Sequence, residues 1–323
     1  MKFKQLGQTG VQVSELCFGT MSFGGDANEE ESARMFQRCR DKGINFFDCA
    51  DGYSKGAAET ILGNLIKGSR DELVITSKCF VPMGDDINAR GGNRRHILRA
   101  VEASLQRLGT DRLDVLLMHR WDAVVPLEET LRALEQLVAD GKVLYLGASN
   151  YAAWQIATGL GISRRNNWPR FDVVQPMYSL VKRQAETEIF PLATAENLGV
   201  MTYSTVGGGL LSGKYGKDRK PETGRIATNP EYTKRYSEDW TFDVAGNFTA
   251  FAEEHGVHPV SLAVAWAAAN PAVTCPIIGA RDLKQLEPSL NAIDVDMTDD
   301  LYAAIAALSR TPPPATDRLE EQL

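Results

Sequence analysis

Short apolar runs alternate with longer amphipathic runs along almost the whole chain. The short runs are rich in Val, Ile, Leu and Phe, which favours buried strands, whereas the longer runs place apolar residues at helical spacing. In the first long run, Met35, Phe36 and Cys39 share one helical face. The predicted strands are residues 16–20, 44–50, 73–79, 113–120, 143–150, 171–178, 200–205 and 273–280. Strands that are each followed by a helix predict an α/β fold with a parallel sheet, and eight such units indicate a closed (β/α)8 TIM barrel, one domain over residues 1–323.

Residues outside this repeat predict a few additions to the barrel. Two short strands about a Gly-containing turn predict an N-terminal β-hairpin over residues 3–14. The stretch 206–240 is expected to be a long irregular loop, with helices near 241–256 and 259–269 after it. The tail 311–323 is Pro-rich and then charged, and we expect it to be partly disordered. A doubly wound open sheet is the alternative architecture, but no glycine fingerprint follows the first predicted strand of the barrel.

Composition narrows the class of protein. The formal net charge is −7, which argues against binding to nucleic acid or to an anionic membrane. The five Cys residues include no C-x-x-C pair, as is usual in a reducing compartment. The first residues lack the apolar core of a signal peptide, and no apolar run is long enough to span a membrane. We therefore expect a cytoplasmic protein.

Polar residues interrupt the strand pattern at the carboxyl ends of three consecutive strands. Asp48, Lys78 and His119 lie there, and Tyr53 follows five residues after Asp48. Active sites of such barrels lie at this end, and strands about 4.8 Å apart bring their terminal side chains within reach of one another. Any one of these residues alone would more often be a helix cap or a satisfied polar group, but four together indicate a site. If they point inward, alternation predicts that their neighbours point outward: Cys49, Cys79 and Met118.

These four side chains suit proton transfer to a carbonyl oxygen. Asp48 would keep Lys78 charged, and the ammonium would lower the pKa of Tyr53 and make it a general acid or base. His119 would donate a hydrogen bond to a substrate oxygen. No side chain carries hydride, so the chemistry implies a nicotinamide cofactor. A lyase or aldolase that uses Lys78 as a Schiff-base amine is an alternative, but Asp48 would raise the pKa of the amine, which opposes that role.

The glycine-rich stretch GGGLLSGKY, residues 207–215, is close to a phosphate-binding P-loop. A P-loop needs Ser or Thr after its Lys and a helix at that point, whereas Tyr215 and a polar run without helical period follow here. The loop is therefore expected to meet phosphate in another context, or to be a surface turn.

The ordered set of motifs resembles the aldo-keto reductase family over nearly all of the chain. The matching motifs are FGTMSFG, FFDCADGY with GAAETILG, ITSK, LLMHR, GASNY, VVQPMYSL, TYSTVGGGLLSGKY and IIGARDLKQLE. The resemblance implies a catalytic tetrad at Asp48, Tyr53, Lys78 and His119, and reduction of an aldehyde or ketone, or the reverse oxidation. It also implies that NAD(P)H binds in an extended form without a Rossmann domain. A regulatory subunit similar to potassium-channel beta subunits is the alternative, since such subunits retain the tetrad.

The same resemblance implies the cofactor contacts. Tyr203 would stack on the nicotinamide, the glycine loop would cover the pyrophosphate, and Arg281 would meet the ribose 2′-phosphate, which favours NADP(H) with NAD(H) as the alternative. Arg281 could otherwise be a surface residue. The implied set is Thr20, Met21, Ser149, Asn150, Gln175, Tyr203, Ser204, Val206, Gly208, Ser212, Lys214, Gly279, Arg281, Gln285 and Ser289. The chain departs from the family pattern at Pro288 and Ser289, where members usually carry an acidic residue and Asn, and this departure removes adenine contacts.

Apolar residues just past the strand ends are candidates for the substrate pocket of a small carbonyl or alcohol. They are Met21, Phe23, Phe80 and Trp121, which would form a hydrophobic rim or pack within their loops. The remaining His residues, His96, His255 and His258, are expected at exposed helix ends, and no convincing metal-ligand spacing is found.

Overall fold

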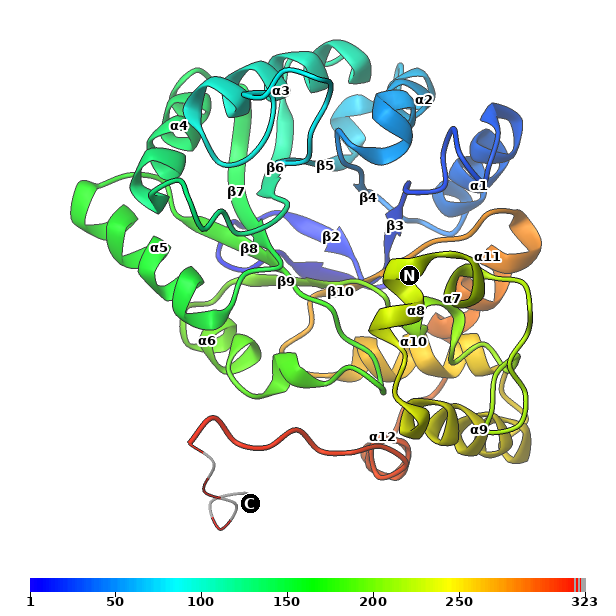
Figure 1. Ribbon diagram of the computed structural model, residues 1–323. Helices are drawn as coiled ribbons and strands as arrows, with labels where there is room; N and C mark the ends of the chain where they lie inside the picture. Colours follow the sequence, from blue (N-terminus) through cyan, green and yellow to red (C-terminus); the bar gives the residue numbers. More distant parts are fainter. Residues whose placement is uncertain (317, 319, 321–323) are drawn as a thin grey trace.

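The computed structural model describes residues 1–316, 318 and 320, and its centre is a closed barrel of eight parallel strands (Figure 1). Around the barrel the strands follow the order β10-β3-β4-β5-β6-β7-β8-β9, so the last strand pairs with the first. Their bounds are β3 (Cys17–Gly19), β4 (Phe46–Asp48), β5 (Val74–Cys79), β6 (Leu113–Met118), β7 (Val143–Ser149), β8 (Phe171–Gln175), β9 (Gly199–Thr202) and β10 (Cys275–Ile278). The predicted (β/α)8 barrel is confirmed, and the open sheet is excluded because closure leaves the barrel no edge strands.

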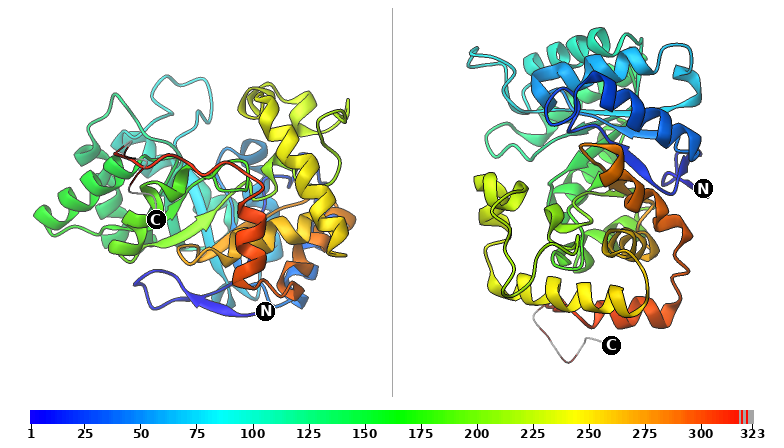
Figure 2. Two further views of the ribbon diagram at one scale, coloured as in Figure 1. Left: turned by 90° about the horizontal axis from the view of Figure 1, so that it is seen from below. Right: turned by 90° about the vertical axis from the view of Figure 1, so that its right-hand side faces the viewer.

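The N-terminal hairpin closes one end of the barrel. Strands β1 (Phe3–Gln5) and β2 (Gln12–Ser14) pair in antiparallel register and lie below the barrel, opposite α7 and α8 (Figure 2, left). Leu6 and Val13 are fully buried in the cluster that fills the barrel interior. A Cβ on Gly199 would lie 2.6 Å from Leu6 Cδ1, so the hairpin packs directly on the start of β9. The carboxyl ends of the strands, at the other end, carry the candidate site.

Several of the helices around the barrel begin at a capping side chain. Asn28, Asn93 and Asp282 accept backbone N–H groups in the first turns of α1, α3 and α11, which satisfies donors that a helix start leaves free. The bounds are α1 (Glu29–Asp41), α2 (Ala57–Leu65), α3 (Arg94–Leu108), α4 (Leu127–Ala139), α5 (Ala153–Asn166), α6 (Ile189–Ala195), α9 (Asp239–Glu254), α10 (Pro259–Ala269), α11 (Leu283–Leu290) and α12 (Asp299–Ala306). The sequence pattern did not predict α12, which begins after the capping residue Thr298.

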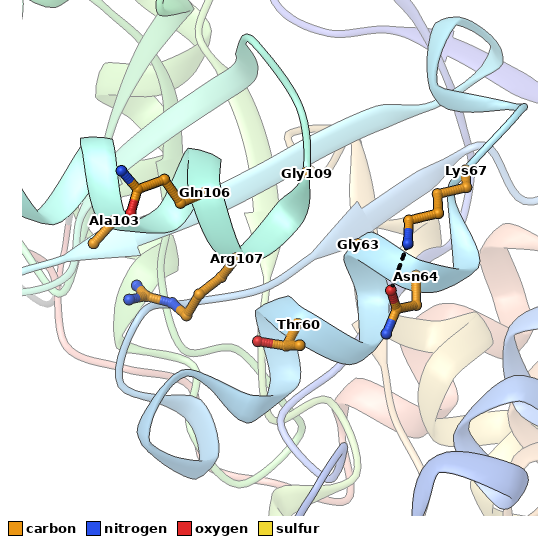
Figure 3. Close-up of a pocket in the computed structure, with 8 residues that line it drawn as sticks. All are labelled: Thr60, Gly63, Asn64, Lys67, Ala103, Gln106, Arg107 and Gly109. Carbon is orange, nitrogen blue, oxygen red and sulfur yellow. Dashed lines mark hydrogen bonds between the residues drawn. The ribbon is translucent and has the colours of Figure 1, made fainter.

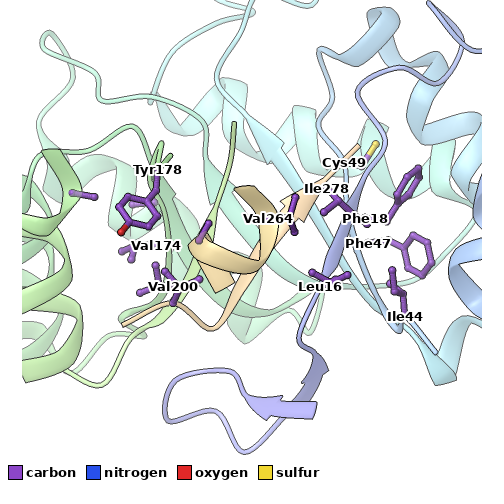
Figure 4. Packing of buried hydrophobic residues seen from close by; sticks show 14 of the residues in the cluster. Leu16, Phe18, Ile44, Phe47, Cys49, Val174, Tyr178, Val200, Val264 and Ile278 are labelled. Carbon is purple, nitrogen blue, oxygen red and sulfur yellow. The ribbon is translucent and has the colours of Figure 1, made fainter. Parts of the chain in front are cut away.

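Alternation along the strands divides the buried residues into two layers. An inner cluster fills the barrel. A larger outer cluster, part of which Figure 4 shows, packs the strands against the helices. Cys49, Cys79 and Met118 belong to the outer layer, with Cys79 Sγ 3.9 Å from Met118 Sδ. The predicted outward orientation of these three residues is confirmed.

The stretch 206–240 is more ordered than the sequence pattern suggested. It contains a 3-10 turn at Gly207–Gly209 and two short helices, α7 (Arg225–Thr228) and α8 (Pro230–Arg235). Asn229 caps α8 and accepts N–H groups from Glu231 and Tyr232. Helices this short span about one turn or two, so no apolar period could reveal them.

Three other expectations need correction or restriction. The helix expected after the predicted strand 171–178 is divided, with a 3-10 turn at Gln184–Glu186 ahead of the short α6. His96 is buried rather than exposed, because it lies in the first turn of α3 on the face that packs inward. The expectation of disorder in the tail falls partly on residues 317, 319 and 321–323, which lie outside the described residues.

Two features are absent from the described part of the chain. None of its helices has both the length and the apolar character needed to cross a membrane. No group of three or more His, Cys, Asp or Glu side chains in the same part could hold a metal ion.

Candidate active site

The ends of β4, β5 and β6 bring the four predicted catalytic side chains together. Asp48 ends β4 and lies in register with Thr76 on β5, two residues before Lys78. His119 directly follows β6, and its backbone N–H donates to the carbonyl of Cys79 at 3.1 Å. Tyr53 returns over the strand ends in the loop after β4, where its backbone N–H donates to the carbonyl of Ala50 at 3.2 Å.

Lys78 is the centre of this arrangement. Its Nζ donates to Asp48 Oδ2 at 2.6 Å, to the carbonyl of Cys49 at 2.8 Å and to Tyr53 Oη at 3.1 Å. An ammonium has three donors, so all of them are used. Because Tyr53 Oη accepts from Lys78, its own O–H hydrogen is left to donate elsewhere.

Charge keeps Lys78 protonated. Burial alone would lower the pKa of Lys78, but the charge of Asp48 and the interactions with Tyr53 outweigh burial and raise this pKa above its ordinary value. A Schiff-base amine needs the opposite shift. The geometry therefore disfavours the lyase or aldolase alternative.

The expected lowering of the pKa of Tyr53 is wrong for this structure. Burial of the phenol raises the pKa of Tyr53 to about 12, and the charge of Lys78 only partly opposes it. The phenol is therefore protonated at neutral pH. Such a phenol can donate a proton at neutral pH, whereas the phenolate, which can accept one, forms only at high pH.

His119 lies beside Tyr53 as a neutral ring. The two ring centroids are 6.0 Å apart in an edge arrangement. Burial first, and then the charges of Lys78 and Arg120, lower the pKa of His119 to about 3. Its Nδ1 is buried and has no hydrogen-bond partner among the described residues. A neutral imidazole retains one N–H that could hold a substrate oxygen near Tyr53.

If the chain reduces a carbonyl, as the resemblance in sequence implies, these pKa shifts give an expected pH dependence. Tyr53 stays protonated and His119 stays neutral between pH 6 and 9, so kcat/KM for reduction should be constant to within about twofold over that range. The reverse oxidation needs the phenolate and should rise about tenfold per pH unit. Steady-state rates at fixed ionic strength would test this, and a fall in reduction above pH 7 would indicate a lowered pKa of Tyr53 instead.

The residues predicted to bind the nicotinamide form one connected network beside the tetrad. Tyr203 Oη donates to Asn150 Oδ1 at 2.6 Å, and Asn150 Nδ2 donates to Ser149 Oγ at 3.0 Å and to the carbonyl of His119 at 2.9 Å. Gln175 Nε2 donates to Asp48 Oδ1 at 2.8 Å. Thr20 is buried nearby, with its hydroxyl donating to the carbonyl of Asp48 at 3.1 Å, whereas Met21 is 41% exposed.

The glycine loop after β9 forms the part of the site that is predicted to bind the cofactor phosphates. Gly207, Gly208 and Gly209 all have positive φ, at 61°, 65° and 104°. A Cβ on Gly208 would lie 2.8 Å from the Tyr232 ring, so α8 packs closely on this loop. Lys214 is exposed, and the chain after it forms a bridge between Gly216 and Arg219 rather than a helix. The loop thus lacks the helix N-terminus that a P-loop uses.

Other predicted cofactor residues lie around this loop and α11. Ser204 Oγ is 3.1 Å from Tyr236 Oη, and Ser212 Oγ donates to the carbonyl of Gly209 at 2.6 Å, while Val206 is half-buried. Arg281 is exposed just before α11, and its Nε donates to Gln285 Oε1 at 3.5 Å, with Gly279 two residues earlier. Ser289 is only 4% exposed, which limits the cofactor contact predicted for it.

Of the four candidates for the substrate pocket, Phe23 is an error, and Met21, Phe80 and Trp121 stay candidates. Phe23 is fully buried against Phe18, with centroids 5.8 Å apart, so the prediction that it lines the rim is wrong. Phe80 and Trp121 are half-buried. Trp121 contacts Trp154, which is 62% exposed at the start of α5 and was not singled out from the sequence. Trp154 lies four residues after Asn150, just past the end of β7, and this position in the sequence could have indicated that it lies near the barrel mouth.

Two surface hollows lie outside the barrel mouth. One, of about 450 Å³, lies between α2 and α3, where Lys67 donates to Asn64 (Figure 3). The other, of about 480 Å³, is lined by residues of α2 and by the loop before α1, including Gly24 and Gly25. None of the four tetrad side chains lines either hollow.

Asp51 is a buried carboxyl group behind the tetrad. Neither of its oxygens has a hydrogen-bond partner among the described residues, whereas Glu59 accepts from Arg107 at 2.7 Å and from Ser77 at 2.5 Å. Burial, and then the charge of Glu59, raise the pKa of Asp51 to about 7, although the nearby backbone N–H of Gly52 and the charges of Arg107 and Lys78 act in the other direction.

This shift predicts the effect of Asp51→Asn on stability. An acid whose pKa is raised by folding stabilises the fold fully below its unfolded pKa, and this contribution is lost as pH rises toward the folded value near 7. At about 1.4 kcal/mol per unit, ionisation of Asp51 should cost roughly 4 kcal/mol at pH 8. Asp51→Asn should therefore raise Tm more at pH 8 than at pH 5. The exposed Asp85→Asn is the control, and equal Tm changes at both pH values would contradict the assignment.

Comparisons with known proteins agree with this geometry. The model of the family described as "Aldo/keto reductase family" matches residues 15–310. A probable voltage-gated potassium channel subunit beta from Arabidopsis thaliana is 38% identical over 303 residues, which cover 91% of this chain and 92% of the relative. An uncharacterized oxidoreductase, YrpG, from Bacillus subtilis is 33% identical over 93% of this chain and 94% of its own length. A versiconal hemiacetal acetate reductase from Aspergillus parasiticus is 30% identical, again over 93% and 94% of the two chains.

Proposed function

Because the chain belongs to the aldo/keto reductase family, a family of oxidoreductases, we propose that it reduces an aldehyde or ketone with NADPH, with Tyr53 as the proton donor. The whole chain, residues 1–323, would act as one barrel domain. The hydrogen-bonding of Lys78 carries this proposal, since it leaves the Tyr53 hydroxyl with a free hydrogen at the barrel mouth.

The residues around the mouth fit a nicotinamide nucleotide. The polar groups of Ser149, Asn150 and Gln175 converge beside the tetrad and suit a carboxamide. The glycine loop can bring backbone N–H groups close to a pyrophosphate, and the exposed Lys214 and Arg281 supply positive charge. The cofactor, when bound, would supply hydride to the carbonyl carbon.

The protein side chains then perform the rest of the reaction. His119 would hold the carbonyl oxygen by a hydrogen bond, and Tyr53 would transfer its proton to that oxygen. Lys78 stabilises the phenolate that Tyr53 becomes, and Asp48 keeps Lys78 charged and oriented. In the oxidation direction, the same groups would accept the proton of an alcohol.

A screen of NADPH oxidation tests the proposed function. Aliphatic and aromatic aldehydes, sugars, steroids and quinones would be followed at 340 nm with NADPH and then with NADH. We expect turnover of at least one carbonyl class, and no turnover of any class would count against an enzyme.

Arg281→Ala tests the proposed preference for NADPH. Arg281 would form a planar, bidentate contact with the 2′-phosphate, which NADH lacks. Its removal should raise Kd for NADPH by about tenfold or more and leave Kd for NADH within twofold, as measured by quenching of Trp fluorescence. Lys284→Ala, an exposed cation of α11, is the control. Similar losses for the two nucleotides would place Arg281 away from the 2′-phosphate.

A regulatory role is the second candidate, and the similarity to potassium channel beta subunits supports it. The two candidates differ in turnover. A regulatory subunit would convert about one bound nucleotide per chain and then stop, whereas an enzyme would exchange the oxidised nucleotide and continue.

A further inference from the structure

The Asp48 carboxylate is held by two donors that do not belong to the tetrad. Its Oδ2 faces Lys78, while its Oδ1 accepts from Thr76 Oγ1 at 2.7 Å and from Gln175 Nε2 at 2.8 Å. Thr76 and Gln175 are 0% and 3% exposed. Both hydrogen bonds are therefore shielded from water, and together they determine which carboxylate oxygen is presented to Lys78.

The bond from Gln175 crosses the barrel. Asp48 ends β4 and Gln175 ends β8, and these strands are separated by β5, β6 and β7 on one side of the closed ring. The other side also has three strands between them, so the two residues lie on opposite walls. The backbone carbonyl of Gln175 accepts in turn from Ser149 Oγ at 3.0 Å. The Asp48 carboxylate is thus anchored to the wall that carries the proposed nicotinamide contacts.

Thr76 lies on the same inward face of β5 as Lys78. It is two residues earlier, and its register partner on β4 is Asp48. A β-branched side chain suits a buried strand, so Val would fill this position equally well. What Thr adds over Val is the hydroxyl that donates to Asp48.

We propose that Thr76 is a positioning residue for proton transfer, which with Gln175 fixes Asp48 so that the Lys78 ammonium stays directed at Tyr53. This inference rests on the proposed function. A carboxylate rotates readily about its last bond unless its oxygens are held. Without the anchors on Oδ1, Asp48 would turn, Lys78 would follow it, and the ammonium would leave Tyr53 Oη as negative charge develops there.

Thr76→Val and Thr76→Ser test the role of the hydroxyl. We expect Thr76→Val to lower kcat for reduction about tenfold, with KM and Kd for NADPH unchanged within twofold, because one hydrogen bond to a charged group is lost from the site of proton transfer. Thr76→Ser retains the hydroxyl and should remain within about twofold of the wild-type kcat. If both variants lose kcat equally, the loss does not depend on the hydroxyl and the proposal is overturned.

Thr202→Val is a matched control. Thr202 is a fully buried strand residue whose hydroxyl has no hydrogen-bond partner among the described residues. The Thr202→Val variant should retain the wild-type kcat, and a loss equal to that of Thr76→Val would overturn the proposal.

Gln175→Leu removes the other donor to Asp48 and should lower kcat while also weakening the binding of NADPH. An unchanged kcat in that variant would contradict the cross-barrel anchor.

A stability cycle separates this inference from the proposed function. Tm and urea unfolding would be measured for Thr76→Val, for Asp48→Leu, which has no acceptor, and for the double variant, and none of these measurements requires a substrate. We expect non-additive effects, because the two side chains share one hydrogen bond. If the stability effects are non-additive but the wild type turns over no carbonyl, the anchor on Asp48 is supported and the proposed function is rejected. Additive effects would reject the anchor even if the wild type is an active reductase.

Discussion

Tyr53→Phe is expected to lower kcat for carbonyl reduction by about a thousandfold, within the range that a general acid contributes. Phe retains the ring but lacks the hydroxyl that accepts from Lys78 and would donate to the substrate. The proposed nucleotide contacts lie on other residues, so Kd for NADPH should change by only a few-fold. Steady-state turnover and fluorescence titration with NADPH would measure the two effects separately.

Tyr151→Phe provides a control for this loss. Tyr151 is also a buried tyrosine near the barrel mouth, and its ring packs against Trp121 and Phe171. Its hydroxyl has no place in the proposed proton transfer, so kcat should stay within about twofold. Comparable losses of turnover and of NADPH binding in Tyr53→Phe would show that Tyr53 supports the site rather than donating the proton.

Lys78→Met is expected to have the second large effect, because it alters both stability and turnover. Met approximates the length of Lys without its charge and leaves the buried Asp48 carboxylate without a cation. Breaking a buried ion pair from one side typically costs about 3–5 kcal/mol. The phenolate of Tyr53 would also lose its stabilising charge, so kcat should fall by a factor comparable to that of Tyr53→Phe.

The double variant Asp48→Asn with Lys78→Met separates the two consequences. Asn removes the uncompensated charge, so urea unfolding should show that much of the stability lost in Lys78→Met is recovered. Turnover should not recover, because the ammonium is still missing. A Lys78→Met variant as stable as the wild type would mean that Asp48 is not held as a buried anion by Lys78.

The sequence allowed the barrel and the clustering of the tetrad to be predicted because both follow from local patterns. Strand ends were marked by Asp48, Lys78 and His119, and alternation correctly placed Cys49, Cys79 and Met118 in the outer layer. Closure of parallel strands then forces adjacent strand ends together, whatever the details of packing.

The properties that the sequence did not reveal depend on packing between distant segments. The pKa of Tyr53 is raised because burial outweighs the nearby ammonium, and the extent of burial cannot be read from spacing. Phe23 follows a strand end as Trp121 does, yet its ring turns into the outer core beside Phe18. Thr76 looked like an ordinary strand residue, and only the folded barrel brings it and Gln175 onto one carboxylate.

A single-turnover experiment tests the central claim most directly. Excess protein would be loaded with NADPH, mixed rapidly with the best carbonyl from the screen, and followed at 340 nm. If the tetrad protonates a carbonyl beside a bound nicotinamide, the absorbance should decay at least as fast as steady-state turnover in the wild type and remain almost constant in Tyr53→Phe. Absorbance that persists in the wild type, or decays equally in both proteins, would contradict the account.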